Sequence, residues 1–335
     1  MRNLYIIIFT LSFLFSCIKE ELPIAPYEHN PEQVEMGPDY NNQIFYNLNY
    51  SSVVSENLET DWQIAFECSD SGSHVILNSS IVTKAFKTSS TNFNDVSSIS
   101  GISSNDWLYD APSGCLDSIA LNPLGSLKKL QDFDVLLGNV YILNLGYSVS
   151  GDIDLGYKKI VVDKIDDDQY KIRSANLNGS KDTTVIINKD GELNFKAFSL
   201  SSNSTVEVFP NKNDWDLMFT AYTHIFDFNG SPLPYRVSGV LINRYKTYVA
   251  EDTTLDYNEI NYNNIINNNN LIYSNNIDVI GYNWKTYSGS FTIVENLNYI
   301  IKTSAGLYFK LRFIDFYNDD GVKGCPKFEF QQLQI

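Results

Sequence analysis

The residues that most often carry catalysis or bind metals are scarce in this chain, which has three His, three Met and four Cys among 335 residues. The Cys residues show no C-x-x-C spacing, and the chain has no G-x-S-x-G, H-E-x-x-H or phosphate-binding loop motif. Two acidic runs, Asp166–Asp168 and Asp319–Asp320, could hold Ca²⁺ weakly, but ordinary turn chemistry explains them without a metal. We therefore predict that the protein is not an enzyme, and the sequence leaves its metal content unknown.

The composition favours a folded, extracellular type of protein. Lys and Arg total 24 against 40 Asp and Glu, which gives a formal net charge of -16. An acidic surface repels phosphate backbones, so we expect no nucleic-acid partner. The chain is 43% hydrophobic, 14% aromatic and only 19% charged, which is enough apolar material to build cores rather than disordered segments.

The N-terminus has the pattern of a signal peptide over residues 1–16. Arg2 supplies the positive charge, and the apolar run Leu4–Phe15 is too short to span a bilayer, which needs about 20 residues. The run ends in Leu14–Cys17, which resembles the bacterial lipobox. The pattern predicts cleavage before Cys17 and acylation of its thiol, which would anchor the chain to a membrane. A plain secretory signal with an incidental Cys is the alternative.

The residues that follow Cys17 predict the location of the protein. Ile18–Glu21 has a Lys followed by two acidic residues and resembles the surface-export signal of Bacteroidota lipoproteins, although an ordinary charged tether would look similar. The resemblance implies a surface-exposed, lipid-anchored protein of the cell outer membrane. Residues 17–40 also contain four Pro, and we interpret them as the lipidated Cys and an extended linker. Among the remaining thiols, a Cys68–Cys115 bridge is one arrangement and would leave Cys325 unpaired.

One segment in the first half of the chain matches a segment in the second half at a constant offset of 153 positions. Phe45–Phe66 aligns with Phe198–Phe219 without a gap, and six of 22 positions are identical, including Trp62 and Trp215. Four more segments match in the same order. They pair Val75–Asn78 with Val240–Asn243, Asn105–Trp107 with Tyr282–Trp284, Tyr141–Leu143 with Tyr299–Ile301, and Tyr157–Val162 with Tyr308–Phe313. A repeat of this length is a domain, so we predict a tandem duplication with domains at 41–185 and 186–335.

Both halves have the pattern of antiparallel β-structure. Leu307–Ile314 alternates, which places Leu307, Phe309, Leu311 and Phe313 on one face and Lys310 and Arg312 on the other, which we expect to be solvated. A tight connection at 304–306 predicts a hairpin with Asn298–Thr303. Helical signal is weak, with one or two turns expected at Ser126–Phe133, and the Asn-rich stretch Asn261–Asn270 is expected to be a solvated loop.

The Trp residues of the matching segments are expected to be core anchors. Trp62 and Trp215 occupy equivalent alternating positions. His224 follows Trp215 on the opposite face of the same expected strand. It is then either an ordinary strand residue or a ligand in a groove between the two halves.

The second half resembles the HmuY-like family of secreted haem-binding lipoproteins. The resemblance rests on Asn213–Thr220 and on Tyr308–Tyr317 with Gly324 and Phe328–Phe330, and the first half shows it more weakly through Asp61–Phe66. It implies an all-β fold with two tandem HmuY-like antiparallel β domains. In that family haem sits between finger-like loops and is held by two axial side chains, either His or Met.

The loop region that matches the family's ligand loops, residues 247–287, has neither His nor Met. Haem iron also accepts Tyr, so Tyr257, Tyr262, Tyr273 and Tyr282 remain candidate ligands. A porphyrin could instead stack on Trp284 or a Tyr without iron ligation. Each of these aromatic residues could equally be an ordinary core or strand-surface residue.

The resemblance and the export signal together predict a cell-surface lipoprotein that binds haem, a related tetrapyrrole or another apolar ligand for uptake. Its partners would be the outer membrane through the lipid anchor, haem or haem proteins, and an outer-membrane receptor. The alternative is a surface module on the same β scaffold that binds a protein or a glycan, and the missing His and Met favour it.

Overall fold

The computed structural model describes residues 31–121, 127, 129, 136–149 and 152–334. The predicted signal peptide, Cys17 and nearly all of Ser126–Phe133 lie outside the described residues. The described part is almost entirely antiparallel β-structure, and none of its helices is long and apolar enough to cross a membrane.

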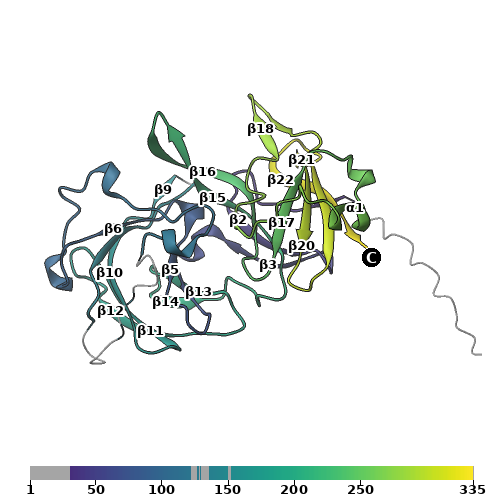
Figure 1. Ribbon diagram of the computed structural model, residues 1–335. Coiled ribbons are helices and arrows are strands. Elements are labelled where there is room, and N and C mark those ends of the chain that lie inside the picture. The colour runs from purple at the N-terminus through teal and green to yellow at the C-terminus, as the bar shows by residue number, and fades with distance from the viewer. Residues whose placement is uncertain (1–30, 122–126, 128, 130–135, 150–151, 335) are drawn as a thin grey trace, which may run out of the picture.

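Four antiparallel sheets form two β-sandwiches that lie side by side (Figure 1). The outer sheet of the first sandwich has the order β12-β11-β10-β7-β6: Thr183–Asn188, Gln169–Asn176, Tyr157–Lys164, Tyr141–Asn144 and Lys84–Lys87. Its inner sheet has the order β14-β13-β4-β5: Ser204–Val206, Phe195–Ser199, Ile64–Glu67 and Val75–Leu77.

The second sandwich has the same plan. Its inner sheet has the order β16-β15-β2-β3: Ser231–Ile242, Leu217–Phe228, Asn42–Asn47 and Ser52–Leu58. Its outer sheet has the order β1-β22-β21-β20-β17: Glu32–Gln33, Lys323–Leu333, Tyr308–Tyr317, Asn298–Lys302 and Tyr248–Asp252.

Short elements connect or extend the sheets. Two hairpins stand apart, β8–β9 (Tyr147–Ser148 with Ile153–Asp154) and β18–β19 (Lys285–Tyr287 with Phe291–Ile293). The 3-10 helices are η1 Glu59–Asp61, η2 Ser79–Ile81, η3 Phe93–Asp95, η4 Ser104–Asp106, η5 Leu116–Ser118 and η7 Tyr257–Glu259, and α1 is Tyr262–Ile266. The Asn-rich stretch predicted to be a loop therefore begins with a short helix.

Each sandwich has its own core, and a third cluster joins the two inner sheets. Strand β15 is apolar on both faces because each face packs against a different cluster. Successive side chains of a strand point to opposite faces. Leu217 and Phe219 face the second core, whereas Met218 and Tyr222 face the cluster between the sandwiches. That interface cluster consists of Phe45, Trp62, Ala65, Phe195, Ala197, Val208, Trp215, Met218, Tyr222 and Leu241. The two Trp residues are buried there, as predicted.

The sheets do not follow the predicted division at 185/186, because the two halves exchange hairpins. The hairpin β2–β3 pairs with β15 of the second sandwich, where Tyr46 lies opposite Leu217. The hairpin β13–β14 pairs with β4 of the first sandwich, where Phe198 lies opposite Ile64. Residues 31–40, predicted as linker, also pack onto the second sandwich, since Met36 is fully buried in its core.

Matching side chains make the same contacts in both sandwiches. Asn78 donates to the carbonyls of Glu59 and Trp62, and Asn243 donates to those of Lys212 and Trp215. The two acceptors of Asn243 lie 153 positions after those of Asn78, although Asn243 itself lies 165 positions after Asn78. Such paired contacts are what a duplication would leave, and the duplication itself stays a prediction.

The solvated face predicted for Lys310 is wrong. Lys310 is only 4% exposed, and its Nζ donates to the carbonyls of Tyr257 and Ile260 at 2.8 and 3.1 Å. Lys159 holds η3 in the same way through the carbonyls of Phe93 and Val96. The ammonium group of each lysine donates to backbone carbonyls of a short turn, and these oxygens take the place of the water that would otherwise solvate its charge.

Two other expectations can be compared directly with the structure. The Cys68–Cys115 bridge is absent, since Cys68, Cys115 and Cys325 are all free thiols. The hairpin between Asn298–Lys302 and the following strand is confirmed, with Lys302 opposite Tyr308.

Candidate functional site

An aromatic groove lies between strand β16 and the hairpin β18–β19. Both the β15–β16 hairpin and β18–β19 project from the same side of the molecule (Figure 1). The groove has a volume of about 780 Å³, which falls within the usual range of about 300–1,000 Å³ for ligand sites. Its aromatic walls are formed by Tyr40, Tyr235, Tyr282, Tyr287, Phe291 and Tyr317. We call it the tyrosine groove.

Three cationic side chains line the same groove, namely Arg236, Lys285 and Lys323. Lys323 lies over the ring of Tyr40, with its Nζ 5.1 Å from the ring centroid. Cations between aromatic faces suit a flat ligand that carries carboxylates, because the rings stack on its faces while the cations pair with its charges.

Lys285 forms part of the floor and is buried. Its Nζ donates to the carbonyl of Ser238 at 2.7 Å and lies 4.1 Å from the ring centroid of Trp284. Burial without an acidic partner lowers the pKa of Lys285 to about 7. The amine is therefore partly neutral at neutral pH, which reduces the charge that has to be held among apolar rings.

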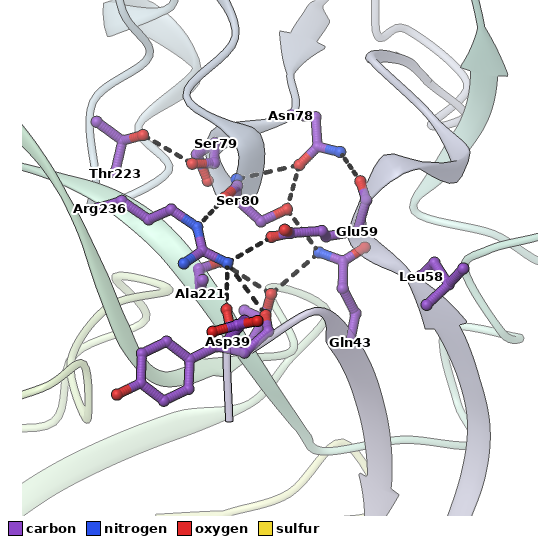
Figure 2. Close-up of polar contacts among 12 residues, drawn as sticks. Asp39, Gln43, Leu58, Glu59, Asn78, Ser79, Ser80, Ala221, Thr223 and Arg236 are labelled. Atoms are coloured by element: carbon purple, nitrogen blue, oxygen red, sulfur yellow. Dashed lines mark hydrogen bonds and ion pairs between the residues drawn. The ribbon is translucent and has the colours of Figure 1, made fainter. Parts of the chain in front are cut away.

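A buried polar network holds Arg236 at the base of the groove (Figure 2). The Nη2 group of Arg236 donates to Glu59 at 2.7 Å and to the carbonyls of Asp39 and Tyr40, while its Nε donates to the carbonyl of Ser80 at 2.7 Å. Glu59 is 1% exposed, and burial raises its pKa to about 7 although Arg236 opposes the shift. The network ties β16 to η1 and η2, and it fixes the backbone that presents Tyr40.

His224 lies behind Tyr282 in an aromatic cluster. Its ring centroid is 5.0 Å from that of Tyr282 and 4.7 Å from that of Phe226. Burial lowers the pKa of His224, so the imidazole is neutral at neutral pH, and its buried Nδ1 has no hydrogen-bond partner. His224 also lies opposite Tyr235 in the β15–β16 pairing.

The structure places only Tyr282, among the predicted site residues, on the wall of the groove. Trp284 is buried in the second core. The ring of Phe313 stacks against Trp284 with a centroid distance of 4.0 Å, and Trp284 Nε1 donates to the carbonyl of Gly281. Since Phe313 and Lys285 both contact its ring, Trp284 offers no open face to a planar ligand.

The other predicted tyrosines belong to a separate region on the outer face of the second sandwich. Tyr257 is buried, and Lys310 and Arg312 both lie 4.5 Å from its ring centroid. Tyr262 and Tyr273 pack around Tyr308 at centroid distances of 5.7 and 6.4 Å. Burial raises the pKa of Tyr257 far above its ordinary value and that of Tyr273 to about 12, which disfavours the phenolate that binds iron.

Sequence reasoning missed most of the groove, in particular Tyr235, Tyr287 and the three cations. The available signal was the apolar and aromatic content of the two hairpins. The sequence does not show that both hairpins project from the same side of the molecule. Within the described residues, no group of three or more His, Cys, Asp or Glu side chains could hold a metal ion.

The family model for the HmuY protein matches residues 39–330, so the chain belongs to the HmuY family. This is a family of binding proteins rather than enzymes. The match runs through both sandwiches, whereas the sequence led us to expect one HmuY-like domain in each half.

Several solved structures are similar to this chain. An apo HmuY analogue from Tannerella forsythia is 10% identical, with 91% of this chain and 96% of that chain covered and a TM-score of 0.25. A putative HmuY-like haem-binding protein from Bacteroides vulgatus is 10% identical over 91% and 95%, with a TM-score of 0.22. Apo PinO from Porphyromonas gingivitis is 8% identical over 91% and 97%, with a TM-score of 0.28. No curated protein matches the chain.

Proposed function

We propose that this HmuY-family protein is a cell-surface lipoprotein that binds haem or a related tetrapyrrole in the tyrosine groove for uptake. The observation that carries the proposal is the groove itself. It combines six aromatic side chains with three cations in a volume of about 780 Å³. A non-enzymatic role agrees with the family and with this arrangement.

The groove would hold the tetrapyrrole mainly by stacking and by charge. Tyr235 and Tyr287 stand on opposite hairpins and are both exposed, so a flat ligand can enter between them. Lys323 would pair with a propionate of a porphyrin, whereas Arg236 is held by Glu59 and would add only positive charge at the base of the groove. Tyr282 is the candidate iron ligand within the groove, because Tyr257 and Tyr262 face another part of the molecule. Burial raises the pKa of Tyr282 as well, so the bound iron would have to stabilise its phenolate.

A spectroscopic titration of the purified full chain with haemin tests this proposal. We expect a saturable shift of the Soret band at about one equivalent. The double variant Tyr235→Ser with Tyr287→Ser should weaken binding at least tenfold. Tyr50→Ser is the matched control, because Tyr50 is similarly exposed (75% against 68% for Tyr287) but lies at the β2–β3 turn. No saturable shift, or equal weakening by the control, would rule out this groove.

Metal-free protoporphyrin separates stacking from iron ligation. If rings and cations supply most of the affinity, protoporphyrin should bind within about tenfold of haemin. Tyr282→Phe should then change the spectrum of bound haemin while leaving protoporphyrin binding unaltered. A strong preference for haemin that Tyr282→Phe leaves intact would show that another side chain ligates the iron.

The proposed location depends on Cys17, which precedes the described residues. Cys17→Ser should release the protein from the outer-membrane fraction. Protease treatment of intact cells should degrade the wild-type chain if it faces outward. Its cargo would then pass to an outer-membrane receptor.

A second candidate is a module that binds another protein. Phe228 and Leu233 at the end of the β15–β16 hairpin are exposed and do not line the groove. Exposed apolar side chains at a projecting tip favour contact with a partner surface. Replacing both with Ser should leave haemin affinity unchanged and reduce partner binding, for example to a haem-carrying protein.

A further inference from the structure

A second cavity lies between the two inner sheets and shares no lining residue with the tyrosine groove. Its volume is about 100 Å³. Its walls are largely apolar and include Trp62, Phe209, Trp215, Met218 and Ile277. We call it the interface cavity, because it borders the cluster that joins the sandwiches.

The two equivalent Trp residues in its wall differ in their hydrogen bonding. Trp62 Nε1 donates to Gln43 Oε1 at 2.9 Å, whereas the buried Nε1 of Trp215 has no partner. Phe195 occupies the place equivalent to Gln43. Gln43 bonds to Thr220, and Phe195 lies opposite Glu67, which precedes Thr220 by 153 positions. The second half therefore has no acceptor for this indole, and the cavity wall there contains an unpartnered donor.

Arg244 brings a positive charge into the same wall. Its guanidinium donates to the carbonyl of Gly114 at 2.8 Å and lies 5.0 Å from the ring centroid of Phe195. It takes part in none of the ion pairs found among the described residues. A guanidinium has five N–H donors, so most of its hydrogen-bonding capacity remains for another group.

Among the described residues that line the cavity, Asp110 is the acidic one, and each of its carboxylate oxygens accepts a backbone N–H. One accepts the backbone N–H of Ala120 at 2.8 Å and the other that of Leu77 at 2.7 Å. Burial raises the pKa of Asp110 to about 6, and the charge of Arg244 opposes that shift from a distance. Asp110 therefore holds the backbone of the wall. Glu67 and Asp110 both act on the charge of Arg244 from a distance, but neither forms an ion pair with the guanidinium.

We propose that the interface cavity binds a short-chain monocarboxylate, whose carboxylate pairs with Arg244 while its alkyl chain lies against Met218 and Ile277. Arg244 is half-buried, and a guanidinium that is partly withdrawn from water is stabilised when an anion compensates its charge. An apolar cavity of about 150 Å³ holds a benzene molecule, so the smaller interface cavity suits an acid of about three to five carbons. The unpartnered Trp215 N–H is available as a second donor.

Titrations of the full chain with butyrate, its neutral isostere butyramide and the longer decanoate test the proposal. Tryptophan fluorescence can report binding, because Trp62 and Trp215 line the cavity, and ligand-observed NMR provides an independent readout. Butyrate should bind at least tenfold more tightly than butyramide, and decanoate should bind no better than butyramide. Equal affinities for butyrate and butyramide, or no saturable binding of butyrate, would overturn the proposal.

Variants at Arg244 then locate the bound carboxylate. Arg244→Gln should weaken butyrate binding at least tenfold and leave butyramide unchanged, whereas Arg244→Lys should retain part of the affinity. Charge-dependent binding that survives Arg244→Gln would place the acid elsewhere and overturn the assignment. If Arg244→Gln does not fold, the comparison of butyrate with butyramide on the wild-type chain still decides whether a carboxylate is selected. Haemin binding at the separate tyrosine groove should not change in either variant.

Discussion

A buried carboxylate immediately before β15 gives a quantitative test of the packing described above. Asp216 is 4% exposed, and its Oδ2 accepts the backbone N–H of Leu48 at 2.8 Å. It belongs to none of the ion pairs among the described residues. Burial raises its pKa from 3.8 to about 6. The equivalent position of the first sandwich has a neutral side chain, because Gln63 Oε1 accepts the N–H of Leu200 at 2.7 Å.

The raised pKa fixes the sign of the pH dependence. Between about pH 4 and 6 the native Asp216 keeps a proton that the unfolded chain has released, so the free energy of unfolding falls as the pH rises through this window. Above pH 6 both states are ionised and the loss is complete. A shift of about two pKa units corresponds to ~3 kcal/mol.

The substitution Asp216→Asn removes the charge and keeps an oxygen for the N–H of Leu48. We expect it to raise the free energy of unfolding by ~2–3 kcal/mol at pH 7.5, and by ~2 kcal/mol less at pH 4.5. Gln63→Glu is the converse change and should destabilise the protein at pH 7.5. Urea unfolding at both pH values measures each effect. If Asp216→Asn destabilises the protein equally at both pH values, the hydrogen bond outweighs the buried charge and the reasoning is refuted.

Three further predictions concern stability. Lys310→Met should cost ~2 kcal/mol in urea unfolding, because it leaves two turn carbonyls unpaired. The control Lys87→Met, at an exposed strand position, should cost little. Gly146→Ala should lower the free energy of unfolding by more than ~3 kcal/mol, since the φ of Gly146 is +83° and an added Cβ would lie 1.8 Å from a backbone oxygen. The control Gly156→Ala should cost only ~1 kcal/mol, because Gly156 has a similar φ of +79° but open space around it. For Glu59, whose pKa burial raises to about 7, stability should fall as the pH rises from 4.5 to 7, and melting curves of Glu59→Gln should show a smaller fall than the wild type.

The strand pattern of each half could be predicted from the sequence, but the hairpin exchange could not. Alternating residues identify the strand Tyr308–Tyr317 and its partner correctly. The hairpin Asn42–Leu58 could pair equally well with the next strand along the chain or with the equivalent strand 153 positions later, because those two strands have the same apolar pattern. Only the packing of complete sheets distinguishes the two pairings.

The exchanged hairpins also differ by one residue from the gapless alignment. The alignment matches Phe45 with Phe198. In the sheets, Tyr46 pairs with Leu217 and Phe198 pairs with Ile64, and Ile64 and Leu217 are 153 positions apart. Tyr46 is therefore the structural equivalent of Phe198. The identity of Phe45 and Phe198 in the alignment is therefore a coincidence, since the two residues are not structural equivalents. A shift of one residue along a strand moves each side chain to the other face of the sheet.

The candidate site could be predicted only in part, because its residues come from separate hairpins. Tyr282 was identified from its position in the expected ligand loops, and it lines the groove. Tyr235 and Tyr287 lie on different hairpins, and their approach depends on how far each hairpin projects beyond the sandwich. Burial was equally hard to foresee. Lys310 and Trp284 occupy positions that alternation alone places on a surface or in a loop, yet both are buried.

The features that suit ligand binding lie where the two halves differ, not where they agree. The shared contacts, such as those of Asn78 and Asn243, hold the frame of each sandwich. By contrast, β15 has twelve residues where the equivalent β4 has four. The extra length, paired with β16, forms the projecting hairpin that carries Tyr235 and borders the tyrosine groove. A frame built from matching contacts can tolerate such extensions, because they add strand length beyond the sandwich without disturbing either core. We therefore expect binding to depend on residues of the second sandwich that have no counterpart in the first.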